Sequence, residues 1–153
     1  MLNVAIVGVG NIGNTHGREY MKRDDCNIVA VCDIIPEKAD KAAEDYDAQA
    51  FYSVSDMLES DVKLDAASMA TKGEENGGDH FEPTMQLLEA GVPTLGEKPI
   101  SNDVGEARKM VALAREKGVR YAIDLNHRFT PAAAKAKECV DDNRLGEINM
   151  INM

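Results

Sequence analysis

The residues in this sequence that could do chemistry begin with three glycines in one short turn. Gly8, Gly10 and Gly13 form a Gly-x-Gly-x-x-Gly pattern directly after the apolar run 4–7 and before a stretch with helical spacing. The first glycine of such a turn permits a tight bend, the second lets backbone approach a phosphate, and the third lets a helix pack closely on a strand. The amide groups and positive dipole end of the helix then hold phosphates. The pattern therefore predicts a pyrophosphate-binding loop.

A carboxylate stands where a dinucleotide-binding fold uses one. The apolar run 28–32 ends at Asp33, twenty residues beyond Gly13, and a carboxylate there accepts hydrogen bonds from the adenosine ribose. It also repels a 2′-phosphate, so we expect NAD as the cofactor, in preference to NADP. The alternative is that Asp33 only caps the helix that Pro36 begins.

A second group of reactive side chains follows the apolar run 93–95. Glu97, Lys98 and Pro99 come directly after it and after Gly96. Open parallel sheets bind ligands at the carboxyl ends of their strands, so the Lys98 ammonium is expected at the same edge as the glycine loop. There it can polarise a substrate hydroxyl or carbonyl, with Glu97 holding it or contacting the cofactor. By itself, Glu-Lys-Pro is also a common solvated loop.

The elements that must position these residues alternate along the chain. Apolar runs separated by stretches of helical spacing predict an α/β fold, a Rossmann-type doubly wound parallel sheet. The expected strands are 4–7, 28–32, 50–52, 64–69, 93–95 and 120–123. The expected helices are 37–46, about 80–90, a segment between Ser101 and the stop signal Gly118, and a segment that begins at Thr130-Pro131.

Composition excludes several classes of protein. The 153 residues carry 17 Lys plus Arg and 27 Asp plus Glu, a formal net charge of −10, so we expect no nucleic-acid partner. No apolar run is long enough to span a bilayer and no charged n-region opens the chain, so we expect a cytoplasmic protein without a membrane partner.

Cysteine and histidine give no sign of a metal centre. Cys26, Cys32 and Cys139 are an odd number without Cys-x-x-Cys spacing, which argues against a disulfide framework and against zinc. We expect them to be buried small hydrophobes and expect no metal site. His16 lies in the first helix, where we expect a packed imidazole rather than a base.

Four motifs in the same order resemble those of one family. They are the glycine loop, Asp33, the run 87–91 that leads to Glu97-Lys98-Pro99, and Asn126-His127-Arg128-Phe129. Together they resemble the glucose-fructose oxidoreductase, inositol dehydrogenase and rhizopine-catabolism (Gfo/Idh/MocA) family over nearly the whole chain. The resemblance implies a Rossmann domain followed by a larger α/β domain. It also implies NAD(P)-dependent hydride transfer between a nicotinamide cofactor and a sugar, cyclitol or related polyol.

The resemblance implies roles for individual residues. Those implied to bind the cofactor are Gly8, Gly10, Asn11, Ile12, Gly13, Asp33, Ile34, Thr71, Glu97 and Lys98. The family's lysine assists proton transfer at the substrate oxygen, so Lys98 is the expected catalytic residue. Those implied to lie near the nicotinamide and substrate are Asn126, His127 and Arg128, which otherwise are ordinary linker residues.

The sequence departs from the family between residues 72 and 80. Most relatives carry Pro-Asn and a short spacer to a histidine here, whereas this loop is longer and rich in glycine. Whether Asn76 and His80 correspond to the family's Asn and His is open, and we read His80 as a first-turn residue of the next helix. The glycines suit either a mobile lid or a backbone contact surface.

The family's other catalytic residues, an Asp and a His, lie in its second domain and beyond this sequence. We therefore expect residues 1–124 to form the dinucleotide-binding domain. Residues 125–153 are expected to be a linker helix and the first strand of a C-terminal substrate domain. We expect this chain by itself to be inactive, and able to be monomeric, whereas the full-length protein is expected to be a homo-oligomer.

Three other functions are compatible with parts of the pattern. The family includes non-catalytic dinucleotide-binding regulators, which would bind NAD without turnover. It also includes NAD-dependent glycosidases, which would retain NAD and show no net redox change. A methyltransferase could use a glycine loop and an acidic ribose contact, but this leaves Glu97-Lys98-Pro99 unexplained.

Overall fold

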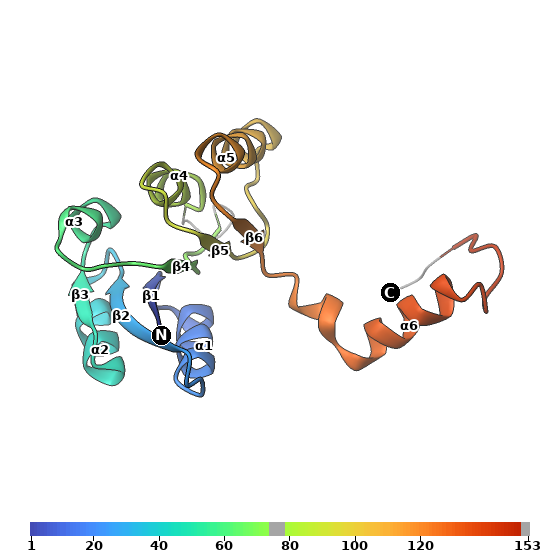
Figure 1. Ribbon diagram of the computed structural model, residues 1–153, viewed down its shortest axis with the longest axis horizontal. Helices are drawn as coiled ribbons and strands as arrows, with labels where there is room; N and C mark the ends of the chain where they lie inside the picture. Colours follow the sequence, from blue (N-terminus) through green and yellow to red (C-terminus); the bar gives the residue numbers. More distant parts are fainter. Residues whose placement is uncertain (74–78, 151–153) are drawn as a thin grey trace.

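A parallel six-stranded sheet forms the centre of the computed structural model, which describes residues 1–73 and 79–150 (Figure 1). The strands are β1 (Leu2–Val7), β2 (Cys26–Cys32), β3 (Gln49–Phe51), β4 (Ala66–Met69), β5 (Thr94–Gly96) and β6 (Tyr121–Ile123). Their spatial order is β3-β2-β1-β4-β5-β6, and every neighbouring pair is parallel. This is the strand order of the Rossmann fold, so the predicted fold class is confirmed.

All six expected strands are present, with small differences at their ends. The expected strand 64–69 begins at Ala66 instead, because Leu64 packs against the core from the preceding loop rather than joining the ladder. The last four residues of β1 are buried. A strand covered on both faces needs such a continuous apolar run rather than an alternating one.

Helices cover both faces of the sheet. They are α1 (Asn11–Tyr20), α2 (Pro36–Tyr46), α3 (Val54–Glu59), α4 (Phe81–Glu89), α5 (Val104–Lys117) and α6 (Pro131–Asp141). Helices α1 and α2 lie on one face, and α3, α4 and α5 lie on the other (Figure 1). The expected start signal at Thr130 is confirmed, since its side chain accepts a hydrogen bond from the Ala133 amide. The expected stop at Gly118 is also confirmed, with φ +65°.

Adjacent residues of β1 supply two separate core layers. Ile6 packs with Val31 of β2 and Tyr46 of α2, whereas Val7 belongs to the layer that contains Met57 of α3. Ile6 and Met57 are fully buried, and burial of such a side chain stabilises the fold by roughly 1.5–3 kcal/mol. The two layers fix β1 in the middle of the sheet, so that the loop after β1 has a rigid base.

Beyond β6 the chain leaves the sheet. A short 3-10 helix (Asn126–Phe129) leads to α6, which stands away from the sheet in Figure 1 and has no buried residue.

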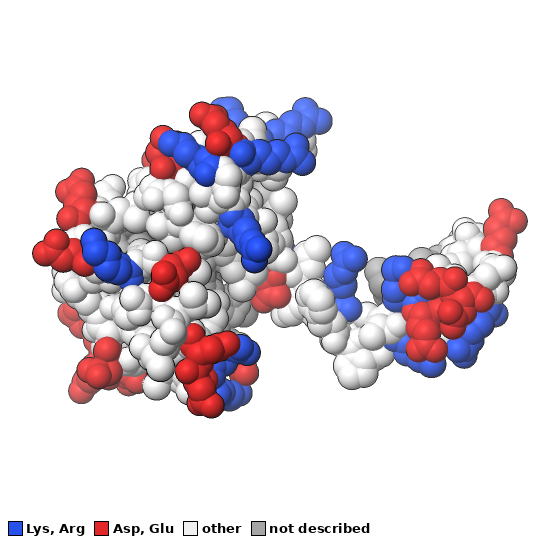
Figure 2. Space-filling view, viewed as in Figure 1, with Lys and Arg blue, Asp and Glu red and all other residues white. Residues whose placement is uncertain are grey.

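On the face in Figure 2, acidic side chains are widespread and basic ones gather over α5, which carries Arg108, Lys109, Arg115 and Lys117. Among the described residues, no helix combines the length and the apolar composition that crossing a membrane requires.

We predict that this fold loses stability at alkaline pH. Burial raises the pKa of Cys32 to about 12, helped by the charges of Asp33 and Asp56, and burial likewise raises the pKa of Tyr121 to about 12. In the unfolded chain these groups lose their protons near their ordinary pKa values of 9.0 and 10.0. The resulting stability is complete below about pH 9 and is lost as pH rises toward 12.

Urea unfolding followed by circular dichroism at pH 8 and at pH 10.5 measures this loss. The drop in unfolding free energy between the two pH values should be smaller in Cys32→Ala and in Tyr121→Phe than in the parent. Cys139→Ala, on exposed α6, is the matched control and should keep the parental drop. An equal drop in all four proteins would contradict the prediction.

Candidate functional site

The candidate site lies along the carboxyl edge of the sheet, where the strands end level with one another. The residue after each of the five strands β1, β2, β4, β5 and β6 donates its backbone amide to the last carbonyl of a neighbouring strand. These bonds are Asp33 to Phe51 (3.1 Å), Gly8 to Cys32 (2.7 Å), Ala70 to Val7 (2.7 Å), Glu97 to Met69 (2.9 Å) and Asp124 to Gly96 (2.8 Å). The ladder therefore brings the expected site residues Gly8, Asp33 and Glu97 to one edge, together with Asp124.

Two of the three loop glycines are required by close backbone contacts. Gly8 has φ +85°, and a Cβ on it would lie 2.6 Å from the Thr71 amide nitrogen. A Cβ on Gly13 would lie 1.8 Å from the Gly8 carbonyl oxygen, which no rearrangement of side chains can relieve. The loop can therefore close against β4 and α1 only with glycine at both positions.

The middle glycine faces open space. A Cβ on Gly10 would meet no atom within 4 Å. Gly10 is the N-cap residue of α1 and makes no side-chain capping bond, and Asn11 and Ile12 of the first turn are exposed. An uncapped helix N-terminus beside an open backbone cradle suits an anionic phosphate. The residues present therefore fit the pyrophosphate of a dinucleotide.

Asp33 supports this loop as well as lying beside it. One carboxylate oxygen accepts the Val9 amide (3.0 Å) and the other accepts the amide of Ile35, the N-cap residue of α2 (3.0 Å). A carboxylate has about four lone-pair positions, so two stay available to hydroxyl donors. The neighbouring residue Ile34 is 86% exposed. The structure brings both residues to the loop, and their expected adenosine contacts stay predictions.

Polar side chains of α1 and α2 also hold the glycine loop. The Asn14 side-chain amide donates to the carbonyl oxygens of Val9 (2.7 Å) and Gly10 (3.0 Å), and the Tyr46 hydroxyl donates to the Asn14 side-chain oxygen (2.8 Å). The Tyr46 ring lies against Gly17, where a Cβ would come within 2.5 Å of it. Helices α1 and α2 therefore hold the loop together. Neither Asn14 nor Tyr46 was expected from the sequence.

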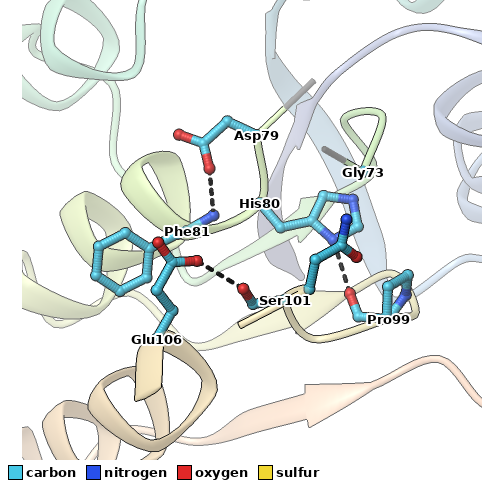
Figure 3. A pocket seen from close by; sticks show the side chains of 8 residues that line it. Gly73, Asp79, His80, Phe81, Pro99, Ser101 and Glu106 are labelled. Carbon is cyan, nitrogen blue, oxygen red and sulfur yellow. Dashed lines mark hydrogen bonds between the residues drawn. The ribbon is translucent and has the colours of Figure 1, made fainter. Parts of the chain in front are cut away.

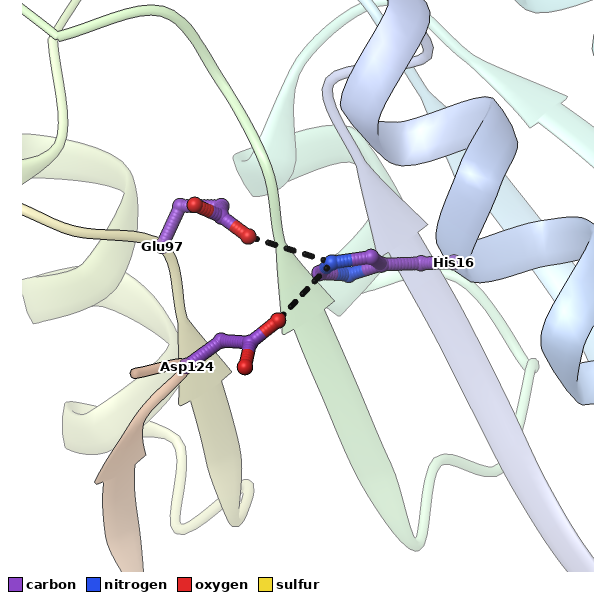
Figure 4. Close-up of side chains that lie close together, drawn as sticks. All are labelled: His16, Glu97 and Asp124. Atoms are coloured by element: carbon purple, nitrogen blue, oxygen red, sulfur yellow. Dashed lines mark hydrogen bonds and ion pairs between the residues drawn. The ribbon is translucent and has the colours of Figure 1, made fainter. Parts of the chain in front are cut away.

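His16 of α1 contacts Ser68 in β4 and the residues that directly follow β5 and β6, of which Figure 4 shows Glu97 and Asp124. Its Nδ1 lies 2.6 Å from the Ser68 hydroxyl, and its Nε2 lies 3.2 Å from a Glu97 carboxylate oxygen and 3.5 Å from an Asp124 carboxylate oxygen. One ligand atom from each of His16, Glu97 and Asp124 lies within 4.8 Å of the others, a spacing open to a metal ion. Here Nε2 is hydrogen-bonded directly to Glu97. The packed imidazole expected at His16 is thus surrounded by polar groups.

His80 contacts the segment after β5 at Pro99 (Figure 3) and the segment after β4 at Thr71. The residue is buried and immediately precedes α4; its Nδ1 lies 2.8 Å from the Pro99 carbonyl oxygen and its Nε2 lies 3.0 Å from the Thr71 carbonyl oxygen. Asp79 accepts the Phe81 amide (2.7 Å) and so caps the helix start. Whether Asn76 corresponds to the family's Asn, and whether the glycines form a lid or a contact surface, are questions that concern residues 74–78, which lie outside the described residues.

Lys98 lies between two residues that are held by histidines: Glu97, which contacts His16, and Pro99, whose carbonyl oxygen contacts His80. Its backbone amide donates to a Glu97 carboxylate oxygen (3.3 Å), its peptide bond to Pro99 is cis, and its side chain is exposed at the sheet edge. Thr71, two residues beyond β4, donates its hydroxyl to the Asp79 carbonyl oxygen (2.7 Å). The structure therefore places Lys98, Glu97 and Thr71 in one region, whereas their ligand contacts stay predictions.

The expected substrate-proximal residues are not joined to this group. Asn126, His127 and Arg128 lie in the exposed 3-10 helix after β6. Within the described ranges, no side-chain hydrogen bond links them to the glycine loop or to Lys98. Their proposed role near a substrate is untested.

The glycine loop, the carboxylate after β2 and the lysine after β5 define the class of protein. Residues 2–125 match the family model of the oxidoreductase family with an NAD-binding Rossmann fold. The chain therefore belongs to the Gfo/Idh/MocA oxidoreductase family, and this part of it is an NAD-binding domain.

Individual relatives are sugar and inositol dehydrogenases. The chain is 34% identical over 148 residues to D-glucoside 3-dehydrogenase of Escherichia coli (strain K12), a match that covers 96% of this chain and 41% of that protein. It is 32% identical over 150 residues to an inositol 2-dehydrogenase of Mycolicibacterium smegmatis, covering 95% and 42%. The structure of the WlbA dehydrogenase from Bordetella pertussis, in complex with NADH and UDP-GlcNAcA, superposes with a TM-score of 0.89 at 27% identity, covering 96% and 41%. The chain spans about two fifths of the length of these relatives.

We predict that the two alanine variants of the loop behave differently. Gly10→Ala should change the unfolding free energy by less than about 1 kcal/mol, because its Cβ enters open space, but should abolish NADH binding. Gly13→Ala should destabilise the domain by about 3 kcal/mol or more, at the upper end of the usual cost of overpacking, because its Cβ overlaps the Gly8 carbonyl. Urea unfolding and calorimetric NADH titration measure both effects. Unchanged NADH affinity in Gly10→Ala would remove this loop from the binding site.

Proposed function

We propose that the whole protein is an NAD-dependent dehydrogenase of CH–OH groups in a sugar, cyclitol or related polyol. The observation that carries this proposal is the shared sheet edge, on which the open Gly10 cradle, Asp33 and the exposed Lys98 follow β1, β2 and β5. Relatives named as sugar and inositol dehydrogenases support the substrate class.

Each end of the cofactor has residues of this chain that suit it. The amides after Gly10 and the α1 dipole would hold the pyrophosphate, and the two remaining lone-pair positions of Asp33 would accept ribose hydroxyls. Glu97 and Thr71 lie toward the nicotinamide end. When bound, NAD supplies the acceptor for a hydride from a substrate C–H bond.

Lys98 would act on the substrate oxygen. Its ammonium would donate hydrogen bonds to that oxygen and lower the free energy of the alkoxide that develops as the hydroxyl proton passes to a base, which the substrate domain would supply. The anchors on Glu97 and Pro99 reduce the freedom of the Lys98 backbone, so that less entropy is lost when the side chain meets a substrate.

The organisation of the whole protein is part of the proposal. We take residues 1–124 as the dinucleotide-binding domain and residues 125–153 as the passage into a substrate domain, where exposed α6 would be covered. Turnover would need that domain to orient the substrate and exclude water, so this chain alone would bind NAD without catalysing. The cytoplasmic location and the homo-oligomer stay predictions.

We predict that the chain binds NADH more tightly than NADPH. The Asp33 carboxylate repels a 2′-phosphate, so the preference should be about tenfold or more. Because the sequence contains no Trp, nicotinamide fluorescence can be titrated against a low protein background. In Asp33→Ala the preference should disappear, and NADH affinity should fall as the Val9 contact is lost. Saturable binding of NADPH with equal or greater affinity in the parent would refute the proposed role of Asp33.

We predict that Lys98→Ala in the whole protein lowers kcat by about 100-fold or more, within the range for loss of an acid–base group. The affinity for NADH should stay within about threefold, because the side chain acts on the substrate. Steady-state kinetics on a panel of polyols, with NADH titration as control, separate the two effects. Unchanged turnover would exclude Lys98 from the mechanism. NADH binding without turnover of any polyol in the parent would favour a regulator.

A further inference from the structure

We propose that His16 is a positioning residue, which fixes the Glu97 carboxylate and through it the backbone at Lys98 relative to the pyrophosphate loop. This inference rests on the proposed function, because it concerns how the nicotinamide half of the dinucleotide is held. His16 itself is not placed in contact with a ligand.

The ring is rigidly tied to the loop. His16 belongs to α1, whose N-terminus is formed by Gly10, and α1 packs through two buried glycines, Gly13 against the Gly8 carbonyl and Gly17 against the Tyr46 ring of α2. The backbone of His16 can therefore move only with the whole helix. The ring also has its rotation restricted, because the hydroxyl of fully buried Ser68 lies 2.6 Å from Nδ1.

The opposite nitrogen of the ring faces two carboxylates from different strands. The side chains of His16 and Glu97 are 11% and 10% exposed, and that of Asp124 is 25% exposed. Poorly solvated carboxylates need hydrogen-bond donors, and Nε2 stands between these two. Without the ring, the two carboxylates would face each other with like charge, so Glu97 would turn away.

Glu97 connects the His16 ring to the backbone of Lys98, the candidate catalytic residue. One of its carboxylate oxygens lies 3.2 Å from His16 Nε2, while the other accepts the Lys98 backbone amide at 3.3 Å. A continuous path of hydrogen bonds therefore runs from α1 through the Glu97 carboxylate to the Lys98 backbone. Rotation of Glu97 would break both bonds together. Through this path, the helix that binds phosphates also sets the position of the loop at the nicotinamide end.

The experiment compares two ligands that differ only beyond the pyrophosphate. Isothermal titration calorimetry of this chain with NADH and with ADP-ribose, which lacks the nicotinamide, measures the two affinities. His16→Ala should weaken NADH binding about tenfold and leave ADP-ribose binding within about threefold. His16→Gln should recover most of the NADH affinity, because its amide can donate to Glu97 and accept from Ser68.

Two more variants make the test specific. Thr15→Ala is the matched control, since Thr15 is the exposed neighbour on α1 and its hydroxyl donates to the Asn11 carbonyl within the same helix. It should leave both affinities unchanged. Ser68→Ala removes the hydroxyl behind the ring from a residue too buried to touch a ligand, and it should weaken NADH binding selectively. If His16→Ala fails to fold, Ser68→Ala tests the same hydrogen-bonded path.

The outcomes separate this inference from the proposed function. Equal losses of NADH and ADP-ribose affinity in His16→Ala or in Ser68→Ala would mean a structural role only and would overturn the inference. Unchanged NADH affinity in His16→Ala would overturn it as well. If the parent chain bound neither ligand, the proposed NAD-dependent activity would fail, and the inference with it.

Discussion

Every proposed role in this domain depends on the register of the parallel strands at their carboxyl ends. A parallel ladder leaves the terminal carbonyl of each strand aimed at the first amide beyond a neighbouring strand. Because Gly8, Asp33, Ala70, Glu97 and Asp124 each satisfy such a carbonyl, they form a row whose spacing is set by the sheet. Side chains on this row meet without any flexible segment having to bring them together.

Beside this row, polar side chains contact protein groups that lie close to the proposed ligand region. Asn14 holds the glycine loop through two carbonyl oxygens, and His80 spans the carbonyl oxygens of Thr71 and Pro99. His16 does the same for the Glu97 carboxylate. A loop held at several points keeps one conformation, and less conformational entropy is lost when it binds.

Local sequence patterns were sufficient to predict most of the secondary structure of this domain. The six strands, the glycine loop and the helix signals at Thr130 and Gly118 depend on neighbours in sequence, and the structure contains all of them. Helix α3 was missed because its six residues (Val54–Glu59) are too few to show a helical period. Its cap, in which Ser53 accepts the Asp56 amide, was the available signal.

Contacts between distant segments could not be predicted in the same way. His16 lies 81 residues from Glu97, and their meeting depends on the order β1-β4-β5-β6, which no local motif contains. The place of Asp124 at the sheet edge could have been predicted, because Asp124 directly follows an expected strand, as Asp33 does. The contact between Asn14 and Tyr46 spans 32 residues and two helices, and the sequence showed only an asparagine inside a helix.

The double duty of Asp33 limits how the cofactor preference of this domain can be re-engineered. The usual exchange for accepting a 2′-phosphate replaces the acidic residue with a smaller or basic one. Here that exchange would also remove the acceptor for the amides of Val9 and Ile35, loosening the turn that binds every dinucleotide alike. A successful redesign would replace the carboxylate with another acceptor for those amides and would introduce its cation along the start of α2.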